Sequence, residues 1–291
     1  MSGMNVVRRI EDLEPARRAV AIGTFDGVHI GHRKVIEAAR VPGLRQTVVT
    51  FDPHPRVTLG ARVELLGTIE RRLELLEELG VEDAVVLHFD EQLAMLSAEE
   101  FAESVFRGAG AEVIAAGKDF VFGRGRHGDL DLLERLGFEV RRVPLVDGVS
   151  STAIRALIAE GDVIGAAALL GRPAEVEGRV ALGDQRGGTL GFPTANVAVP
   201  PTLLAPKRGI YAGSALGRRA AISIGTNPHY GGTEWRVEAF LLDYEGDLYG
   251  ERLIVELWER LRDEAVFDSE ASLIAAIAAD VERTRAAVRP G

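Results

Sequence analysis

The chain has 291 residues, of which 46% are hydrophobic and 27% charged, a composition typical of globular proteins and a length that favours two domains. Its net charge of −10, with both halves acidic, argues against a nucleic-acid partner. The absence of cysteine excludes disulfide bonds and thiolate catalysis. No apolar run reaches the roughly 18 residues of a membrane helix, and no secretory signal follows Arg8 and Arg9. We therefore expect a cytoplasmic protein without a membrane partner.

The first half of the chain alternates short apolar runs with amphipathic helical segments. The apolar runs cover residues 19–22, 47–51, 84–87, 112–116 and 139–143. Between them, residues 69–79 carry leucines at helical spacing, and Ser97 with Glu100 forms a capping box before residues 101–106. This alternation predicts an α/β domain with a doubly wound parallel sheet, the class of many nucleotide-binding proteins.

A helical connector over residues 152–170 ends at Gly171, shortly before Pro173, and we place the domain boundary there. The predicted domains are residues 1–171 and 172–291. Beyond the boundary, strand-like runs at 175–182, 209–215, 220–224, 236–243 and 252–257 are separated by glycine-containing turns. One helix over residues 269–287 follows them. The pattern predicts a small antiparallel β-barrel with a C-terminal helix.

A glycine-containing loop with two histidines follows the first predicted strand and leads into a helix. It reads Gly23-Thr-Phe25-Asp26-Gly-Val-His29-Ile-Gly-His32. A loop that enters a helix amino terminus presents backbone N–H groups to phosphate, and His29 and His32 can both donate to the same anion. Two surface histidines or a zinc site are the alternatives, but no third ligand stands at helical spacing. The context favours phosphate.

Hydroxyl side chains gather at the start of the connector helix, in the run Ser150-Ser151-Thr152-Ala-Ile-Arg155. Arg155 projects one helical turn later, beside the hydroxyls. Capping of the helix would by itself explain Ser151 and Thr152. Together with the histidine loop, the run also fits a second part of a phosphate site.

Four local patterns, at residues 23–32, 50–56, 117–123 and 150–155, make the first half resemble one family. This half is similar to the His-x-Gly-His nucleotidylyltransferases, specifically the FMN adenylyltransferase domain of prokaryotic bifunctional riboflavin kinase/FAD synthetases. The resemblance implies that His29 and His32 contact the triphosphate of ATP, and that the FMN phosphate itself attacks. It also implies that Ser151, Thr152 and Arg155 hold the departing phosphates. Further residues that it assigns to the nucleotide or FMN site are Gly23, Phe25, Asp26, His54, Pro55 and Asp119.

The second half contains a glycine-rich loop at residues 183–191 that leads into Phe192-Pro-Thr194-Ala-Asn196. The loop lacks the G-x-x-x-x-G-K-[ST] form, so it is not a conventional P-loop. Thr194 and Asn196 alternate on a predicted strand, and their oxygens could share a magnesium ion on one face. A polar strand edge after a turn is the alternative.

The run Pro193-Thr194-Ala195-Asn196 resembles a motif of riboflavin kinases, and residues 209–213, 237–243, 248–250 and 261–264 are also similar to that domain. The resemblance implies that Thr194 and Asn196 bind Mg²⁺ with ATP and that Gly191 lies at the ATP site. It makes Glu238 the base for the ribityl hydroxyl of riboflavin, although an outward-facing strand residue is the alternative. It brings Arg262 near the flavin and nucleotide.

Two positions depart from the kinase pattern: His229-Tyr230 follows Pro228, and Phe240 stands where histidine is common. Either could alter flavin affinity. Together the resemblances imply synthesis of FMN from riboflavin and of FAD from FMN, with ATP as co-substrate and Mg²⁺ at both steps. The alternatives are a single active adenylyltransferase domain with a flavin-binding sensor barrel, or another nucleotidyl acceptor. The oligomeric state is not predicted.

Overall fold

The computed structural model describes residues 3–182, 192–226 and 235–291, which form two compact units. The first unit comprises Met1–Val63 and Ile69–Val149. The second comprises Glu64–Thr68 and Ser150–Gly291. The chain therefore passes from one unit to the other three times.

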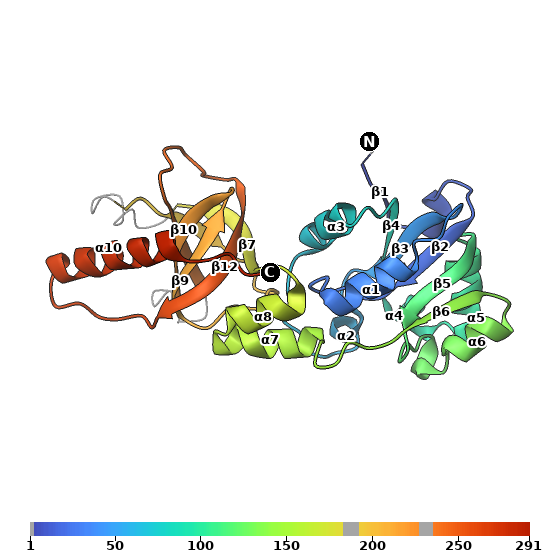
Figure 1. Ribbon diagram of the computed structural model, residues 1–291. Coiled ribbons are helices and arrows are strands. Elements are labelled where there is room, and N and C mark those ends of the chain that lie inside the picture. Colours follow the sequence, from blue (N-terminus) through green and yellow to red (C-terminus); the bar gives the residue numbers. More distant parts are fainter. Residues whose placement is uncertain (1–2, 183–191, 227–234) are drawn as a thin grey trace. The chain divides into compact units, whose positions relative to one another are not determined.

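A six-stranded sheet forms the centre of the first unit (Figure 1). Its strand order is β1-β4-β3-β2-β5-β6, and every neighbouring pair is parallel. The strands are β1 (Asn5–Val7), β2 (Arg18–Ile22), β3 (Arg45–Phe51), β4 (Asp83–Leu87), β5 (Ala111–Gly117) and β6 (Glu139–Val143). The predicted parallel sheet is confirmed, and the short edge strand β1 is an addition.

Both faces of this sheet are covered, as the alternation of side chains along β2 shows. Val20 and Ile22 point into a core that includes Phe101 and Phe106, whereas Ala19 and Ala21 point into the opposite core. The first core is closed by α5 (Ala98–Phe101), a π-helical turn (Ala102–Arg107) and α6 (Leu130–Arg135). The second is closed by α1 (Ile30–Ala38) and α3 (Ile69–Glu78). Two further short helices are α2 (Pro55–Thr58) and α4 (Glu91–Met95).

The order of the strands creates a switch point beside β2. From β2 the chain continues to β3 and β4 on one side, and then crosses to β5 and β6 on the other. In open parallel sheets, ligands bind outside the carboxyl ends of the strands where the order reverses. The carboxyl ends of β3, β2 and β5, which are neighbours in the sheet, are therefore the expected place for a substrate.

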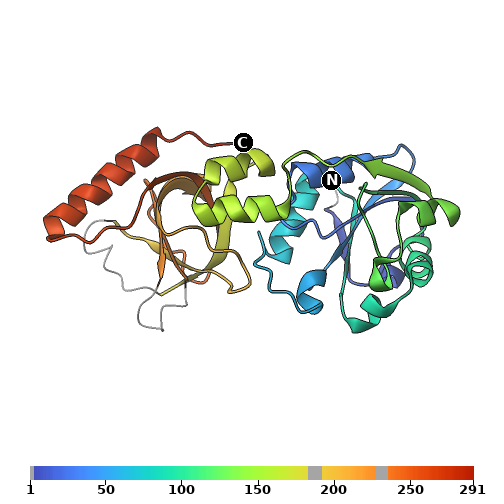
Figure 2. The same ribbon diagram turned by 90° about the horizontal axis from the view of Figure 1, so that it is seen from below.

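The second unit contains a closed barrel in which the strands follow the order β10-β11-β8-β7-β12-β9 and every neighbouring pair is antiparallel. The strands are β7 (Ala174–Ala181), β8 (Ala195–Ala198), β9 (Gly209–Ala215), β10 (Arg218–Thr226), β11 (Trp235–Leu241) and β12 (Arg252–Arg262). The helix α10 (Glu270–Ala286) lies against β9 and β10 (Figure 2). The predicted barrel with a C-terminal helix is confirmed.

The connector before the barrel consists of two helices, α7 (Ser151–Glu160) and α8 (Val163–Leu170), where the sequence predicted one. Gly161, with a φ of 84°, ends α7, and the side chain of Asp162 caps α8. The apolar side chains of both helices, such as Ile154 and Val163, pack into the core of the barrel. Within the described parts of the chain, no helix is long and apolar enough to cross a membrane.

Candidate functional site

The two histidines of the first motif lie at the amino terminus of α1. His29 is the N-cap, and its Nδ1 accepts a hydrogen bond from the backbone N–H of His32 at 3.2 Å. In the neutral ring the proton is therefore on Nε2, which can donate to an anion. The rings of His29 and His32 are stacked with their centroids 3.5 Å apart. The first turn of α1 thus presents two imidazoles together with the positive end of the helix.

Burial keeps His32 neutral. Its Nδ1 is buried and has no hydrogen-bond partner among the described residues. Its ring packs edge to face against that of Phe25, with the ring centroids 5.4 Å apart. Burial, followed by the nearby His29 and Arg72, lowers the pKa of His32 well below its ordinary value. A buried, unpartnered ring nitrogen beside a helix amino terminus is an atom that a ligand can satisfy.

The backbone of the same loop is strained. Phe25 and Val28 have φ angles of 50° and 40°, in the left-handed region that side chains rarely adopt. Both side chains and Asp26 are nevertheless almost fully buried. Strain that the surrounding structure maintains is concentrated at functional sites, so it supports a binding role for this loop.

Two other predicted residues, His54 and Asp119, follow the strands that lie beside β2. His54 follows β3, is 7% exposed, and caps α2 by accepting a hydrogen bond from the backbone N–H of Arg56; Pro55 begins that helix. Asp119 is exposed two residues after the end of β5. Gly23 directly follows β2, between them. The carboxyl edge of the sheet therefore brings these residues and the histidine loop to one region of the first unit.

The hydroxyl run lies in the second unit. Ser151 and Thr152 are the first two residues of α7, and Arg155 follows one turn later. The helix is capped by Ser150, whose side chain accepts a hydrogen bond from the backbone N–H of Ala153 at 3.1 Å. The N-cap of α7 is therefore Ser150, and Ser151 and Thr152 belong to the first turn of the helix.

A cavity of about 440 Å³ opens between the outer face of the barrel and α10. The predicted residues Thr194, Asn196, Glu238 and Arg262 all line it. Asn196 on β8 stands directly opposite Glu238 on β11, which fixes their neighbouring positions. Thr194 lies just before β8, although the sequence predicted both Thr194 and Asn196 within a strand. Glu238 lies on the outward-facing side of β11, as the alternative expected, and there it lines this cavity.

Charged partners organise the cavity. Two nitrogens of Arg262 donate charge-assisted hydrogen bonds to Asp280 on α10, with Nη2 at 2.6 Å from Oδ2 and Nε at 3.1 Å from both oxygens. Arg236 lies with its Nε 3.7 Å from Oε1 of Glu238. Phe240 also lines the cavity, where its ring meets that of Phe192 edge to face. The cavity thus combines hydroxyl and amide oxygens, three carboxylates, two guanidinium groups and aromatic walls.

Sequence reasoning missed two charged residues of this cavity, Arg236 and Asp280. Arg236 lies two residues before Glu238 on β11. Because side chains two apart on a strand share a face, this spacing could have placed Arg236 beside Glu238. Asp280 had no local signal, because it comes from a helix that only the tertiary fold brings to Arg262. Gly191, His229 and Tyr230 lie outside the described residues.

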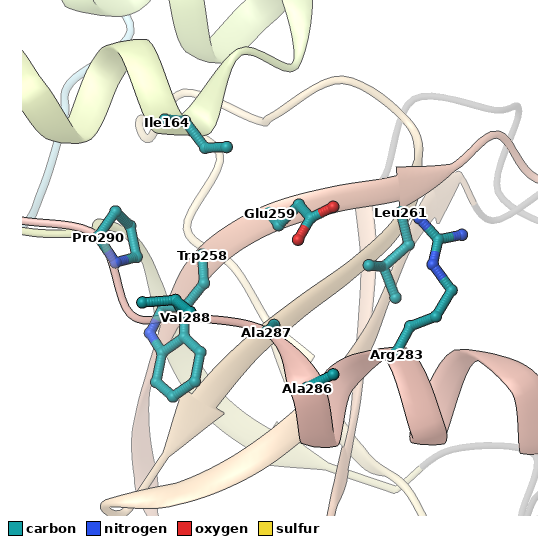
Figure 3. Close-up of a pocket in the computed structure, with 9 residues that line it drawn as sticks. All are labelled: Ile164, Trp258, Glu259, Leu261, Arg283, Ala286, Ala287, Val288 and Pro290. Atoms are coloured by element: carbon teal, nitrogen blue, oxygen red, sulfur yellow. The ribbon is translucent and has the colours of Figure 1, made fainter.

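A second cavity of about 500 Å³ lies between α8, β12 and the C-terminal segment (Figure 3). Trp258, Val288 and Pro290 form much of its apolar lining, and Glu259 and Arg283 are its charged members. None of the predicted site residues lines it. Its lining is mainly apolar, whereas the cavity beside Glu238 has a larger set of charged side chains among its apolar ones.

Comparison with protein families gives two matches that together span most of the chain. Residues 12–155 match the FAD synthetase family, and residues 170–288 match the riboflavin kinase family. Proteins described as bifunctional riboflavin kinase/FMN adenylyltransferase are similar over nearly the whole length. The Listeria monocytogenes protein is 35% identical, with 92% of each chain covered. The Pseudomonas fluorescens protein is 36% identical, with 99% of each covered.

A solved structure has the same architecture. A crystal structure described as a macrolide-efflux protein from Streptococcus pneumoniae superposes with a TM-score of 0.87, at 33% identity, and covers 97% of this chain and 98% of its own. The match extends through both units, in the same order. By the family matches and by relatives that are similar over nearly the whole of both chains, the chain belongs to the bifunctional riboflavin kinase/FMN adenylyltransferase family.

Proposed function

We propose that this chain makes flavin cofactors in two consecutive steps, phosphorylation of riboflavin to FMN and adenylyl transfer from ATP to FMN, which yields FAD and pyrophosphate. The observation that carries the proposal is the convergence of Thr194, Asn196 and Glu238 on one cavity in a chain of this family. The stacked histidines of the first unit provide the second centre. Riboflavin, FMN and ATP are the small-molecule partners.

In the kinase step, Glu238 accepts the proton of the ribityl 5′-hydroxyl. The hydroxyl oxygen then forms a bond to the γ-phosphorus of ATP, and the bond from that phosphorus to the oxygen of ADP breaks. The pairing of Asn196 with Glu238 across two strands holds the base beside the phosphate ligands. Arg262, itself oriented by Asp280, supplies a positive charge at the same cavity.

The residues around Thr194 and Asn196 suit a magnesium ion. A hydroxyl, a side-chain amide oxygen and the carboxylate of Glu238 line the cavity, and Mg²⁺ prefers such oxygen ligands completed by water and phosphate. When bound, the ion would neutralise charge on the phosphates. Thr194 and Asn196 would hold it, and Glu238 would remain available for the substrate proton.

In the adenylyl transfer, an oxygen of the FMN phosphate attacks the α-phosphorus of ATP, and the bond to the β-phosphate oxygen breaks. No side-chain nucleophile is needed, so catalysis depends on position and electrostatic stabilisation. His29 and His32 would donate to the phosphates, while Ser151, Thr152 and Arg155 would hold the departing pyrophosphate. The remaining walls of this site are assigned to Gly23, Phe25, Asp26, His54, Pro55 and Asp119.

We assign adenylyl transfer to residues 1–171 and the kinase to residues 172–291. The two family matches, which end at residue 155 and begin at residue 170, support this division. The packing boundary between Val149 and Ser150 differs from it, because α7 and α8 bury their apolar faces against the barrel. The use of ATP in both reactions supports a cytoplasmic location.

A barrel that only senses flavin is the alternative function. The presence of Thr194, Asn196 and Glu238 in one cavity favours catalysis instead. Incubation of the purified protein with riboflavin, ATP and Mg²⁺, followed by chromatography, should give both FMN and FAD. Glu238→Gln should lower FMN formation by about 10²–10⁴-fold, the range for loss of a general base, and still convert supplied FMN to FAD. A wild-type protein that forms FAD only from supplied FMN would support the sensor.

A further inference from the structure

A buried arginine of the first unit has no place in the assignments above. Arg72 lies on α3, where it shares a helix face with Leu75 and Leu76, and its exposed fraction is 4%. Arginine is almost never fully buried without a charged partner. Its position on the apolar face of α3 therefore calls for a reason.

The guanidinium of Arg72 is connected to the histidine loop through one hydroxyl. Its Nη1 donates to Oγ1 of Thr50 at 3.2 Å and to the carbonyl of Phe51 at 3.0 Å, both at the end of β3. Thr50 is fully buried, and its hydroxyl donates in turn to the carbonyl of Thr24 at 3.0 Å. Thr24 stands at the start of the loop that carries the histidines. Arg72 thus fixes the direction of a hydrogen-bond chain that ends on this loop.

Neutral groups satisfy Arg72 only in part. Its Nε is buried without a hydrogen-bond partner, and within the described ranges no carboxylate pairs directly with it. Arg18, which is buried on β2, has such a partner in Asp83. A buried cation without a paired carboxylate is strongly destabilising. Arg72 therefore holds a charge that the protein itself leaves largely uncompensated.

The surroundings of this charge point to an anion. Burial lowers the pKa of Arg72, whereas the more distant carboxylates of Asp26 and Asp52 oppose that shift. The same guanidinium helps to lower the pKa of His32, so the cation and the imidazole are electrostatic neighbours. Arginine stays protonated in spite of such shifts. A fixed positive charge that neighbours the stacked histidines is suited to phosphates, which bring the missing negative charge.

We propose that Arg72 is a positioning residue for adenylyl transfer: through Thr50 it fixes the histidine loop, and its unpaired charge prepares that region for the phosphates of the substrates. The inference rests on the proposed adenylyl transfer. A structural arginine, comparable to Arg18, is the competing interpretation.

The test compares four single variants, and the double variant of Thr50→Val with Arg72→Met, under saturating and limiting ATP with FMN supplied. Arg72→Met removes both the charge and the hydrogen bonds, whereas Arg72→Lys retains the charge. Thr50→Val breaks the connection to Thr24 with little change in volume. Arg71→Gln is the matched control, because the neighbouring Arg71 has carboxylate partners, Glu74 and Glu78, on the same helix. Riboflavin kinase activity of the same samples reports the integrity of the second unit.

We expect Arg72→Met to reduce kcat/KM for FAD formation by about 100-fold, as for loss of one preorganised donor. Arg72→Lys should have a kcat/KM about tenfold higher than that of Arg72→Met, because the charge remains. Thr50→Val should lower kcat about tenfold, and its effect should be less than multiplicative when combined with Arg72→Met, because both act on one chain of hydrogen bonds. Arg71→Gln should retain the wild-type values.

A structural role predicts a different pattern, in which FAD formation falls only in proportion to the folded fraction measured by thermal unfolding. Equal kcat/KM for folded Arg72→Met and Arg71→Gln would overturn the proposal. If Arg72→Met does not fold, wild-type kcat and KM in both Arg72→Lys and Thr50→Val would overturn it. Absence of FAD with the wild-type protein would instead reject the proposed adenylyl transfer itself.

Discussion

His29 has two roles that substitution can separate. Its Nδ1 caps α1 through the backbone N–H of His32, while its Nε2 can donate to phosphate. Asparagine is a good N-cap residue but lacks the imidazole, whereas alanine provides neither function. His29→Asn and His29→Ala should therefore differ in stability and agree in the loss of FAD formation.

The expected magnitudes follow from these contacts. Loss of the cap in His29→Ala should lower the free energy of unfolding of the first unit by about 1 kcal/mol. His29→Asn should keep most of that stability. Loss of a phosphate donor should reduce the rate of FAD formation by about 100-fold in both variants, which corresponds to about 2.7 kcal/mol of transition-state stabilisation.

Initial rates with supplied FMN and ATP, separated by chromatography, measure the activity, and urea unfolding measures the stability. The rate of FMN formation from riboflavin serves as the internal control and should stay unchanged. A His29→Asn variant that forms FAD within threefold of the wild-type rate would refute the reasoning, because the imidazole would then contribute only as a cap.

Two further predictions concern the charges of the two sites. Because the pKa of His32 is lowered below 6.5 in the folded state, the unfolded state binds more protons under acidic conditions, and the first unit should lose stability as the pH falls below about 6.5. Urea unfolding at several pH values should show a slope of up to about 1.4 kcal/mol per pH unit from this group, and a His32→Gln variant with the same slope would contradict the assignment. Asp280→Asn should raise KM for riboflavin about tenfold through loss of the charged partner of Arg262, a change of about 1.4 kcal/mol, while FAD formation from supplied FMN stays constant. Steady-state kinetics with each flavin checks this, and an unchanged KM would show that Arg262 needs no partner.

Local patterns were sufficient to predict most elements of the fold. The run at residues 139–143 coincides with β6, and that at 209–215 coincides with β9. The capping box of Ser97 and Glu100 is present, because it depends only on residues three positions apart. The prediction for the connector was wrong in one respect: the sequence predicted one helix, but Gly161 separates two. Glycine signals a possible break, but the packing of both helices against the barrel decides that the break occurs here.

The histidine loop was visible in the sequence, because its chemistry resides in one short run between a strand and a helix. Asp280, Arg236 and Arg72 were not recognised. Asp280 and Arg72 occur on amphipathic helices, where a charged residue ordinarily faces solvent. Their burial and their partners arise from strands distant in the sequence.

The sequence by itself determined the two architectures, the histidine loop and the candidate ligands Thr194 and Asn196, because periodicity, capping and short motifs depend on neighbouring residues. Only the tertiary structure decided that Asn196 faces Glu238, that Asp280 orients Arg262, and that α7 and α8 pack with the barrel. These facts depend on strand register and on burial, which are set by contacts between segments far apart in the chain. The burial of Arg72 was likewise decided by the tertiary structure, because only the fold removes its charge from water and brings it near His32.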